Sequence, residues 1–394
     1  MGTRRQFLVG TATATAALLV KRRSAAAERK AIQPPPAWFL ARLPRLMEIS
    51  GTPGLTSIVI QQGTIVWQHH EGVLKAGDAA RVGPETMWPA ASLGKPVFAA
   101  AALTLASEGV FDLDRPLRDY VPDHAASDDR TKKVTARHVL SHSAGFPNWR
   151  GRPDQPLASE FEPGSRFSYS GEGYYYLQRV VEHITGLGAQ QFVNERVFEP
   201  LAMKSATYGW RADVPSRLVT GHDRGVTRPP RELPSQLFEY ARAHEKCFDA
   251  FSYEDVRGAM ARIPGSPPPV PNAMVPNVAG SLLTTSADYA KFLCAVLDDS
   301  GRLLTVSKAM RQSMATPQVT LNSAMAWGLG WGIETGSGVL WHWGDNGNWK
   351  NFVLIQPRDK AALVVFTNGS HGMNVAERLV AAATGDDHVA FQWL

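Results

Sequence analysis

The feature that most constrains the fold is the position of the strand-like segments, which lie near both ends of the chain. Near the N-terminus, LTSIVIQQGTIVWQHHEGV (residues 55–73) is typical of two strands around a turn at Gln62 and Gly63. Near the C-terminus, NFVLIQPRDKAALVVFTNG (residues 351–369) is typical of a second hairpin that turns at residues 357–360. We therefore expect an α+β fold in which one antiparallel sheet, flanked by helices, is assembled from both ends of the chain.

The middle of the chain carries mostly helical patterns and is expected to form a helical lobe. This lobe spans about residues 115–275 and is inserted between sheet-forming segments at about 35–114 and 276–394. Residues 211–276 are poorly patterned and flanked by proline-rich breaks, so we interpret them as loops and an insertion. The apolar periodicity predicts helices at about 35–50, 92–108, 171–186, 189–203 and 375–383 and one within residues 279–299.

The first 27 residues have the layout of an export signal. Paired arginines at Arg4 and Arg5 precede an apolar stretch at residues 7–20, and small residues offer a cleavage site near Ala27. This pattern predicts a twin-arginine signal, a mature domain at residues 28–394, and a periplasmic or secreted location. The apolar stretch is too short to span a bilayer, and no run of 18 or more apolar residues occurs elsewhere in the chain.

Net charge gives no reason to expect a nucleic-acid partner. The chain has 41 Lys and Arg against 36 Asp and Glu, but five of the basic residues lie in the first 27 positions, which contain no acidic residue. The predicted mature domain therefore carries 36 residues of each sign, and the excess positive charge belongs to the export signal.

The histidines and cysteines do not form a recognisable metal site. His69 and His70 are adjacent in a predicted strand, so their side chains are expected on opposite faces. His138 and His142 have helical spacing but no third ligand nearby, which favours a structural role. We expect neither a metal nor another cofactor; whether Cys247 and Cys294 pair is left open.

One short stretch, WPAASLGKPVFAAAALTLASEG (residues 88–109), places Ser92 three residues before Lys95 at the start of a predicted helix. Residues three apart on a helix share a face, so the amine can lie beside the hydroxyl. A serine hydroxyl is a weak nucleophile until a base removes its proton, and burial can lower a lysine pKa enough for it to act as that base. The pattern alone is weak, because such four-residue spacings are common by chance.

Two further motifs support a catalytic role for Ser92 and Lys95. Tyr169-Ser170-Gly171 precedes a predicted helix, and His342-Trp343-Gly344 lies in a strand-like segment. With Ser92-Leu93-Gly94-Lys95 these motifs resemble, in order and spacing, those of the serine β-lactamase and penicillin-binding-protein family. The similarity covers about residues 37–385 and is closest to the class C β-lactamase, esterase and D-aminopeptidase branch. LSHSAGFP (140–147), EPLAM (199–203) and WGLGWGI (327–333) also resemble this family.

The resemblance implies a β-lactamase/transpeptidase-like fold and a role for each motif residue. Ser92 would be the acylated nucleophile, while Lys95 and Tyr169 would share the base and acid work, with Tyr169 protonating the leaving group. His342 would hydrogen-bond the substrate or Tyr169 from a neighbouring strand.

The same resemblance implies an oxyanion hole, and aromatic residues near the motifs offer a pocket. The backbone N–H groups of Ser92 and Asp345, which follows Gly344, would stabilise the oxyanion. Removal of one such donor typically costs about 10²–10³-fold in rate. Trp343 is the best candidate for an aromatic pocket wall, although strand alternation would turn it away from His342.

Two departures from the family pattern bear on the substrate. Gly171 stands where the family usually has an asparagine that holds an acylamido group, and His342 stands where many β-lactamases have a lysine that binds a carboxylate. The acylation machinery is kept, so the sequence favours an esterase or a D-aminopeptidase or amidase with a small-molecule substrate.

A β-lactamase or DD-carboxypeptidase remains an alternative reading. So does a non-catalytic protein that binds cell-wall peptides. Neither the natural substrate nor the oligomeric state can be inferred from the sequence.

Overall fold

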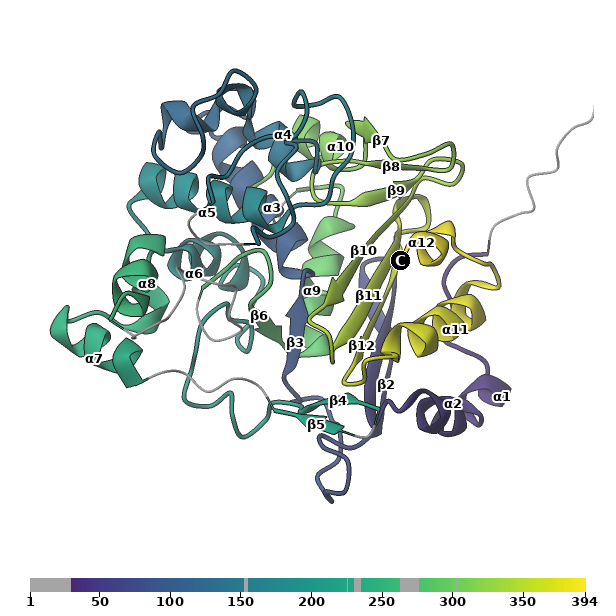
Figure 1. The fold of residues 1–394 in the computed structure, drawn as a ribbon. Helices are drawn as coiled ribbons and strands as arrows, with labels where there is room; N and C mark the ends of the chain where they lie inside the picture. Colours follow the sequence, from purple (N-terminus) through teal and green to yellow (C-terminus); the bar gives the residue numbers. More distant parts are fainter. Residues whose placement is uncertain (1–29, 152–154, 225, 230–234, 263–275, 302–303) are drawn as a thin grey trace, which may run out of the picture. The chain divides into compact units, whose positions relative to one another are not determined.

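An eight-stranded sheet forms the centre of the fold (Figure 1), and every neighbouring pair of its strands is antiparallel. The computed structural model describes residues 30–394 except 152–154, 225, 230–234, 263–275 and 302–303, so the predicted signal at 1–27 lies outside the described residues. In spatial order the strands are β2 (Thr64–Gly72), β1 (Gly54–Gln61), β12 (Ala361–Thr367), β11 (Lys350–Gln356), β10 (Val339–Asp345), β9 (Gly332–Glu334), β8 (Met325–Trp327) and β7 (Val319–Thr320).

The first strands of the chain pair with the last, as the sequence predicts. Leu55 of β1 lies opposite Thr367 of β12, and the two strands stay in register to Gln61 and Ala361. The β1–β2 turn has positive φ at both Gln62 (49°) and Gly63 (69°), which suits a tight hairpin between twisted strands. The α+β class and the antiparallel sheet flanked by helices are therefore confirmed.

Both faces of the sheet are covered, so the central strands are apolar on both sides (Figure 1). In β1, Leu55 and Val59 enter one core, and Ile58 and Ile60 enter the core on the opposite face. The first face is covered by α1 (Ala37–Leu40), α2 (Leu43–Ser50), α11 (Gly372–Thr384) and α12 (Val389–Trp393). The opposite face is covered by α9 (Ser286–Val296) and, beyond it, α3 (Gly94–Ser107).

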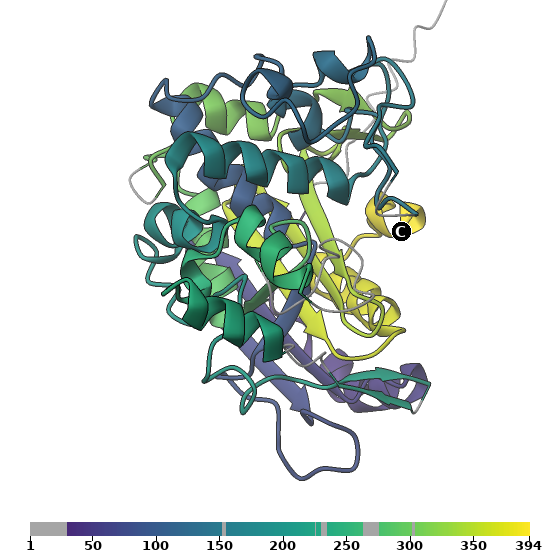
Figure 2. The ribbon, with the colours of Figure 1, turned by 60° about the vertical axis from the view of Figure 1, so that its left-hand side comes forward.

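The remaining helices lie on the α3 side of the sheet (Figure 2). The alanine-rich α3 is buried along almost its whole length, since small side chains let its neighbours approach closely. Around it lie α4 (Ala136–Leu140), α5 (Gly171–Thr185), α6 (Ala189–Val193) with a π-helical turn (Asn194–Phe198), α7 (Ser235–Ala243), α8 (Tyr253–Met260) and α10 (Lys308–Met314).

Residues 211–276 contain more regular structure than the sequence pattern predicts, so the interpretation as loops was wrong. They include a hairpin of β4 (Gly221–Asp223) and β5 (Val226–Arg228) and the helices α7 and α8. These helices pack mainly on each other in a small separate core, and each is short, with nine and eight residues. The predicted helix at 35–50 is also divided, at residues 41–42, into α1 and α2.

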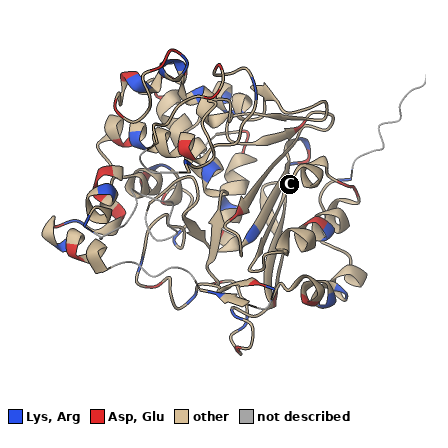
Figure 3. Ribbon diagram, in the orientation of Figure 1, with Lys and Arg blue, Asp and Glu red and all other residues tan. Residues whose placement is uncertain are grey.

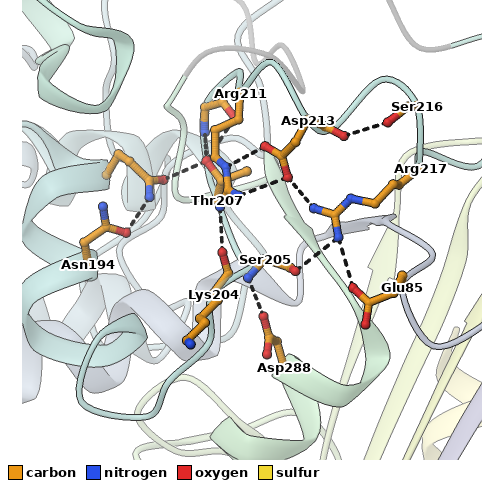
Figure 4. Close-up of polar contacts among 12 residues, drawn as sticks. Glu85, Asn194, Lys204, Ser205, Thr207, Arg211, Asp213, Ser216, Arg217 and Asp288 are labelled. Atoms are coloured by element: carbon orange, nitrogen blue, oxygen red, sulfur yellow. Dashed lines mark hydrogen bonds and ion pairs between the residues drawn. The ribbon is translucent and has the colours of Figure 1, made fainter.

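A polar network anchors the loop before β4 to the strand that leads into the candidate site (Figure 4). Arg217 bonds Glu85 (Nη1–Oε2, 3.3 Å) and also pairs with Asp213. The Met87 N–H donates to the Arg217 carbonyl (2.9 Å), which joins this loop to the start of β3 (Trp88–Ala91). Because the ion pairs are solvent-exposed, the backbone bond contributes more reliably to holding β3 in place.

Charges of both signs are interspersed over the described helices and loops (Figure 3). Within the described part of the chain, no helix is long and apolar enough to cross a membrane. Cys247 is exposed and Cys294 is partly buried, and both are free thiols rather than a disulfide.

Candidate active site

Ser92 lies in a tight turn between strand β3 and helix α3. The preceding Ala91 has φ of 54°, a left-handed conformation that is unfavourable for a residue with a Cβ atom. The Leu93 N–H donates to the Ala90 carbonyl (3.2 Å), and the Lys95 N–H donates to the Ser92 carbonyl (3.0 Å). Backbone strain of this kind persists only where the surroundings enforce it, and here the turn leaves Ser92 partly exposed between buried neighbours.

Lys95 is buried and in contact with Ser92. Its Nζ lies 3.0 Å from Ser92 Oγ and donates to the Ala279 carbonyl at 2.5 Å. Burial lowers the pKa of the ammonium from 10.5 to about 7, because removal from water penalises the charged form. Near neutral pH a large fraction of Lys95 is therefore uncharged and able to accept the Ser92 proton.

Tyr169 lies beside the same pair. Lys95 Nζ is 4.8 Å from the centroid of the Tyr169 ring. Burial raises the pKa of the Tyr169 hydroxyl; nearby Ser92 opposes the rise, and Asp345 adds to it. The hydroxyl is buried without a well-formed hydrogen bond in the described part of the chain. Tyr169 therefore enters a reaction as a protonated phenol, suited to donate a proton and not to abstract the first one.

His342 lies on β10, close to Tyr169 and fully buried. The ring centroids of Tyr169 and His342 are 6.3 Å apart, and the His342 Nδ1–H donates to the Trp343 carbonyl at 2.8 Å. Burial, with a smaller contribution from Lys95, lowers the pKa of His342 to about 3. Its Nε2 is buried without a partner among the described residues, so the expected bond to Tyr169 is not formed in this state. A neutral His342 cannot replace a lysine as the counter-charge for a carboxylate.

Gly344 and Asp345 bring the end of β10 next to Ser92. A Cβ atom at Gly344 would lie 2.1 Å from the Ala90 carbonyl oxygen, so the two backbones approach more closely than a side chain permits. Asn351 Nδ2 donates to the Pro89 carbonyl (2.8 Å) and ties β11 to the same strand. The pairing of β10 with β9 ends at Trp341, so residues 342–345 of β10 have no strand partner on that side among the described residues. The Asp345 carboxylate bonds Lys350 (2.6 Å).

Trp343 supports Tyr169 rather than standing alone in a pocket. Its ring centroid lies 4.7 Å from that of Tyr169 and 5.1 Å from that of Trp393 on α12. The C-terminal helix therefore contacts the candidate site through an aromatic pair, although no sequence motif indicates this contact. The tyrosines at 174–176 are buried on α5 and belong to the packing of the fold.

His142 has the structural role that the sequence favours, but its position at the candidate site was not expected. His138 has a different structural role, since it caps α4 through Thr135. His142 has φ of 53°, its Nδ1 accepts the Ser170 N–H at 3.1 Å, and its ring lies 4.1 Å from that of Tyr169. His142 thus holds the loop that carries Tyr169. The sequence signal for a position at the site was that His142 lies within LSHSAGFP, a segment that resembles the family.

Gly171 begins helix α5, two residues after Tyr169. The space that a side chain there would enter is filled, because a Cβ atom would lie 2.3 Å from the nearest indole carbon of Trp149. Trp149 was not recognised from the sequence, since it lies in an irregular loop. In the described part of the chain no group of three His, Cys, Asp or Glu side chains could hold a metal ion.

Comparisons with known proteins indicate the family to which the chain belongs. The family model described as Beta-lactamase matches residues 39–385. Penicillin-binding protein 4 of Amycolatopsis lactamdurans is 27% identical over 349 residues, which cover 80% of this chain and 81% of that protein. Esterase EstB of Burkholderia gladioli is 26% identical over 209 residues, covering 45% of this chain and 52% of that protein.

A solved structure supports the same fold. The octameric penicillin-binding protein homologue of Pyrococcus abyssi superposes with a TM-score of 0.67 at 20% identity, covering 88% of this chain and 78% of that one. At this identity the likeness concerns the fold alone. Because the family model covers most of the chain, the protein belongs to the Beta-lactamase family, as the motifs predict.

Proposed function

We propose that this chain is a serine hydrolase that forms an acyl-enzyme on Ser92 from an ester or amide of a small acyl or D-aminoacyl group. The observation that carries the proposal is the buried Lys95, whose Nζ lies 3.0 Å from Ser92 Oγ and whose pKa is lowered to about 7. A surface lysine would stay charged at neutral pH and could not accept the proton.

In the proposed acylation, neutral Lys95 accepts the Ser92 proton while Oγ attacks the substrate carbonyl carbon. The oxyanion is stabilised by the backbone N–H groups of Ser92 and Asp345. Tyr169 gives its proton to the departing alkoxide or amine as the carbon–heteroatom bond breaks, and Lys95 returns a proton to Tyr169. Water then attacks the acyl-serine with the same groups in reverse roles, which releases the acid and restores Ser92.

An esterase or amidase is favoured over a β-lactamase or DD-carboxypeptidase by the surroundings of this machinery. The neutral His342 offers no positive charge to a substrate carboxylate. The indole of Trp149 occupies the place where an acylamido-binding side chain would begin. A non-catalytic binding protein would not need a neutral lysine beside a serine. This alternative is one outcome of the test below.

The test is hydrolysis of p-nitrophenyl butyrate by residues 28–394, with Ser92→Ala beside Ser143→Ala. Ser143 is a buried serine within SHSAG, and its Oγ lies 2.9 Å from Ser141 Oγ. We expect turnover in the wild type and in Ser143→Ala, and none in Ser92→Ala. Turnover in Ser92→Ala would show that another nucleophile acts. No turnover and no fluorophosphonate labelling of wild type would support the binding protein.

We also propose export through the paired arginines at Arg4 and Arg5. Replacement of both by lysine should retain the protein in the cytoplasm, and the exported wild type should begin near residue 28. Fractionation and N-terminal sequencing check this, and unchanged export of the double variant would contradict it.

A further inference from the structure

The indole of Trp149 replaces the side chain that position 171 lacks. Its Cζ2 and Cη2 atoms would lie 2.3 and 2.4 Å from a Cβ atom at Gly171. Position 171 follows Tyr169 by two residues, so a side chain there would start beside the proposed acid. The ring therefore lies against the start of α5, two residues from Tyr169 in the chain, and comes from a different segment.

The loop around Trp149 is held firmly against the start of α5. Its neighbours on both sides make hydrogen bonds to three consecutive residues there, whereas the indole is left 38% exposed. The bonds are Ser170 Oγ–H to the Pro147 carbonyl (2.8 Å), Gly171 N–H to Asn148 Oδ1 (2.9 Å), Glu172 N–H to the Asn148 carbonyl (3.0 Å), and Arg150 N–H and Nε–H to Glu172 Oε1 (3.1 and 2.9 Å).

This anchoring gives the ring a fixed position. The Arg150–Glu172 pair is largely buried, with side-chain exposures of 19% and 8%, so it is not a loose surface contact. An aromatic ring that is fixed in place and still open to solvent beside a reactive centre suits an apolar partner, because contact with such a partner removes apolar surface of both from water. Fixing the ring in advance also reduces the entropy lost on binding.

We propose that Trp149 forms the acyl-group subsite and selects substrates whose acyl group has an apolar or aromatic face over substrates with an acylamido group. This inference rests on the proposed function and names the substrate class of the same site. The indole offers no carbonyl to accept an amide N–H, and it fills the place where an amide side chain would begin. Replacement of Gly171 by asparagine is therefore insufficient to create acylamido recognition.

The test compares kcat/KM for three p-nitrophenyl esters: acetate, butyrate and N-acetyl-D-alaninate. Trp149→Ala should lower kcat/KM for butyrate about tenfold relative to acetate, since the longer chain loses its apolar contact. Gly171→Asn alone should gain nothing on the acylamido ester. Trp149→Ala combined with Gly171→Asn should raise the acylamido-to-butyrate ratio at least tenfold over wild type.

Trp38→Ala is the matched control, because Trp38 is a 59% exposed tryptophan on α1 and lies outside the site. It should leave all three rates unchanged. An unchanged butyrate-to-acetate ratio in Trp149→Ala would overturn the inference about the subsite. The proposed function would still hold in that case, provided that acetate turnover depends on Ser92.

If wild type turns over no ester and takes no fluorophosphonate label, the proposed function fails, and binding tests the subsite instead. Isothermal titration of Ser92→Ala should then show tighter binding of phenylacetate than of N-acetyl-D-alanine. That preference should be lost in Ser92→Ala/Trp149→Ala. Equal binding of both acids would refute the subsite.

Discussion

The pH dependence of acylation is the sharpest test of the role given to Lys95. With a pKa of about 7, the neutral fraction of this lysine rises from about 0.1 at pH 6 to about 0.9 at pH 8. We therefore expect kcat/KM for p-nitrophenyl butyrate to rise about tenfold over this interval and to level off above pH 8. A lysine at its ordinary value of 10.5 would give a rise of about a hundredfold that continues past pH 9.

The assay follows p-nitrophenol at a wavelength where its absorbance does not depend on pH, with Ser92→Ala as the background at each pH. Because kcat/KM reports the free enzyme, the midpoint gives the pKa of the base before substrate binds. The buried His342 and His142 cannot supply this midpoint, since burial holds the pKa of both below 6.5. A rate that still increases at pH 9 would refute the assignment of Lys95 as the base.

A second readout of the same pKa needs no substrate. Between pH 7 and 10.5 the unfolded chain keeps the lysine proton and the folded chain does not, so the free energy of unfolding rises with pH in this window. From pH 7 to 9 the wild type should gain about 2 kcal/mol over a Lys95→Met variant. Parallel stability curves for the two proteins would contradict a lowered pKa, whatever the kinetics showed.

Two further substitutions separate chemistry from packing. Tyr169→Phe should lower kcat/KM by about 10²–10⁴-fold without lowering Tm, because the lost hydroxyl is buried and has no well-formed hydrogen bond among the described residues. The control Tyr176→Phe removes a 2.8 Å bond to the Val121 carbonyl, so it should lower Tm but keep activity. Equal effects of both on rate would argue against Tyr169 as the acid. Gly344→Ala should abolish activity and lower Tm, since its Cβ would lie 2.1 Å from the Ala90 oxygen. Gly336→Ala is the control and should change neither, because the space around Gly336 is open. An active Gly344→Ala variant would show that the close approach of the two backbones is dispensable.

The fold could be predicted from the sequence where an apolar pattern is long. The terminal hairpins and the helices α3 and α5 pack on large cores, α3 being buried almost all round and α5 along an apolar face. Strands β7 to β9 have only two or three residues each, too few to show an alternation. Helices α7 and α8 are amphipathic but have only nine and eight residues, so each gives a short pattern, although Ser252 and Asp255 form a capping box that marks the start of α8.

The candidate site follows from the sequence only as far as its motifs do. The order of Ser92, Tyr169 and His342 along the chain indicates which residues can meet, and the structure places them together. The lowered pKa of Lys95 depends on burial against Ala279, which no local pattern reveals. The ring of Trp149 reaches position 171 from an irregular loop, whose path is set by bonds to a later helix and not by propensity.

The pairing of β1 with β12 has a consequence for how the molecule is made. The central partner of β1 is β12, which ends at Thr367, so β1 must wait until residues 361–367 have been made before this partner exists. Contacts this distant in sequence slow folding and leave early strands exposed in the meantime. Newly made chains should therefore depend on chaperones until β12 has emerged from the ribosome, and truncations that remove β12 should aggregate rather than fold.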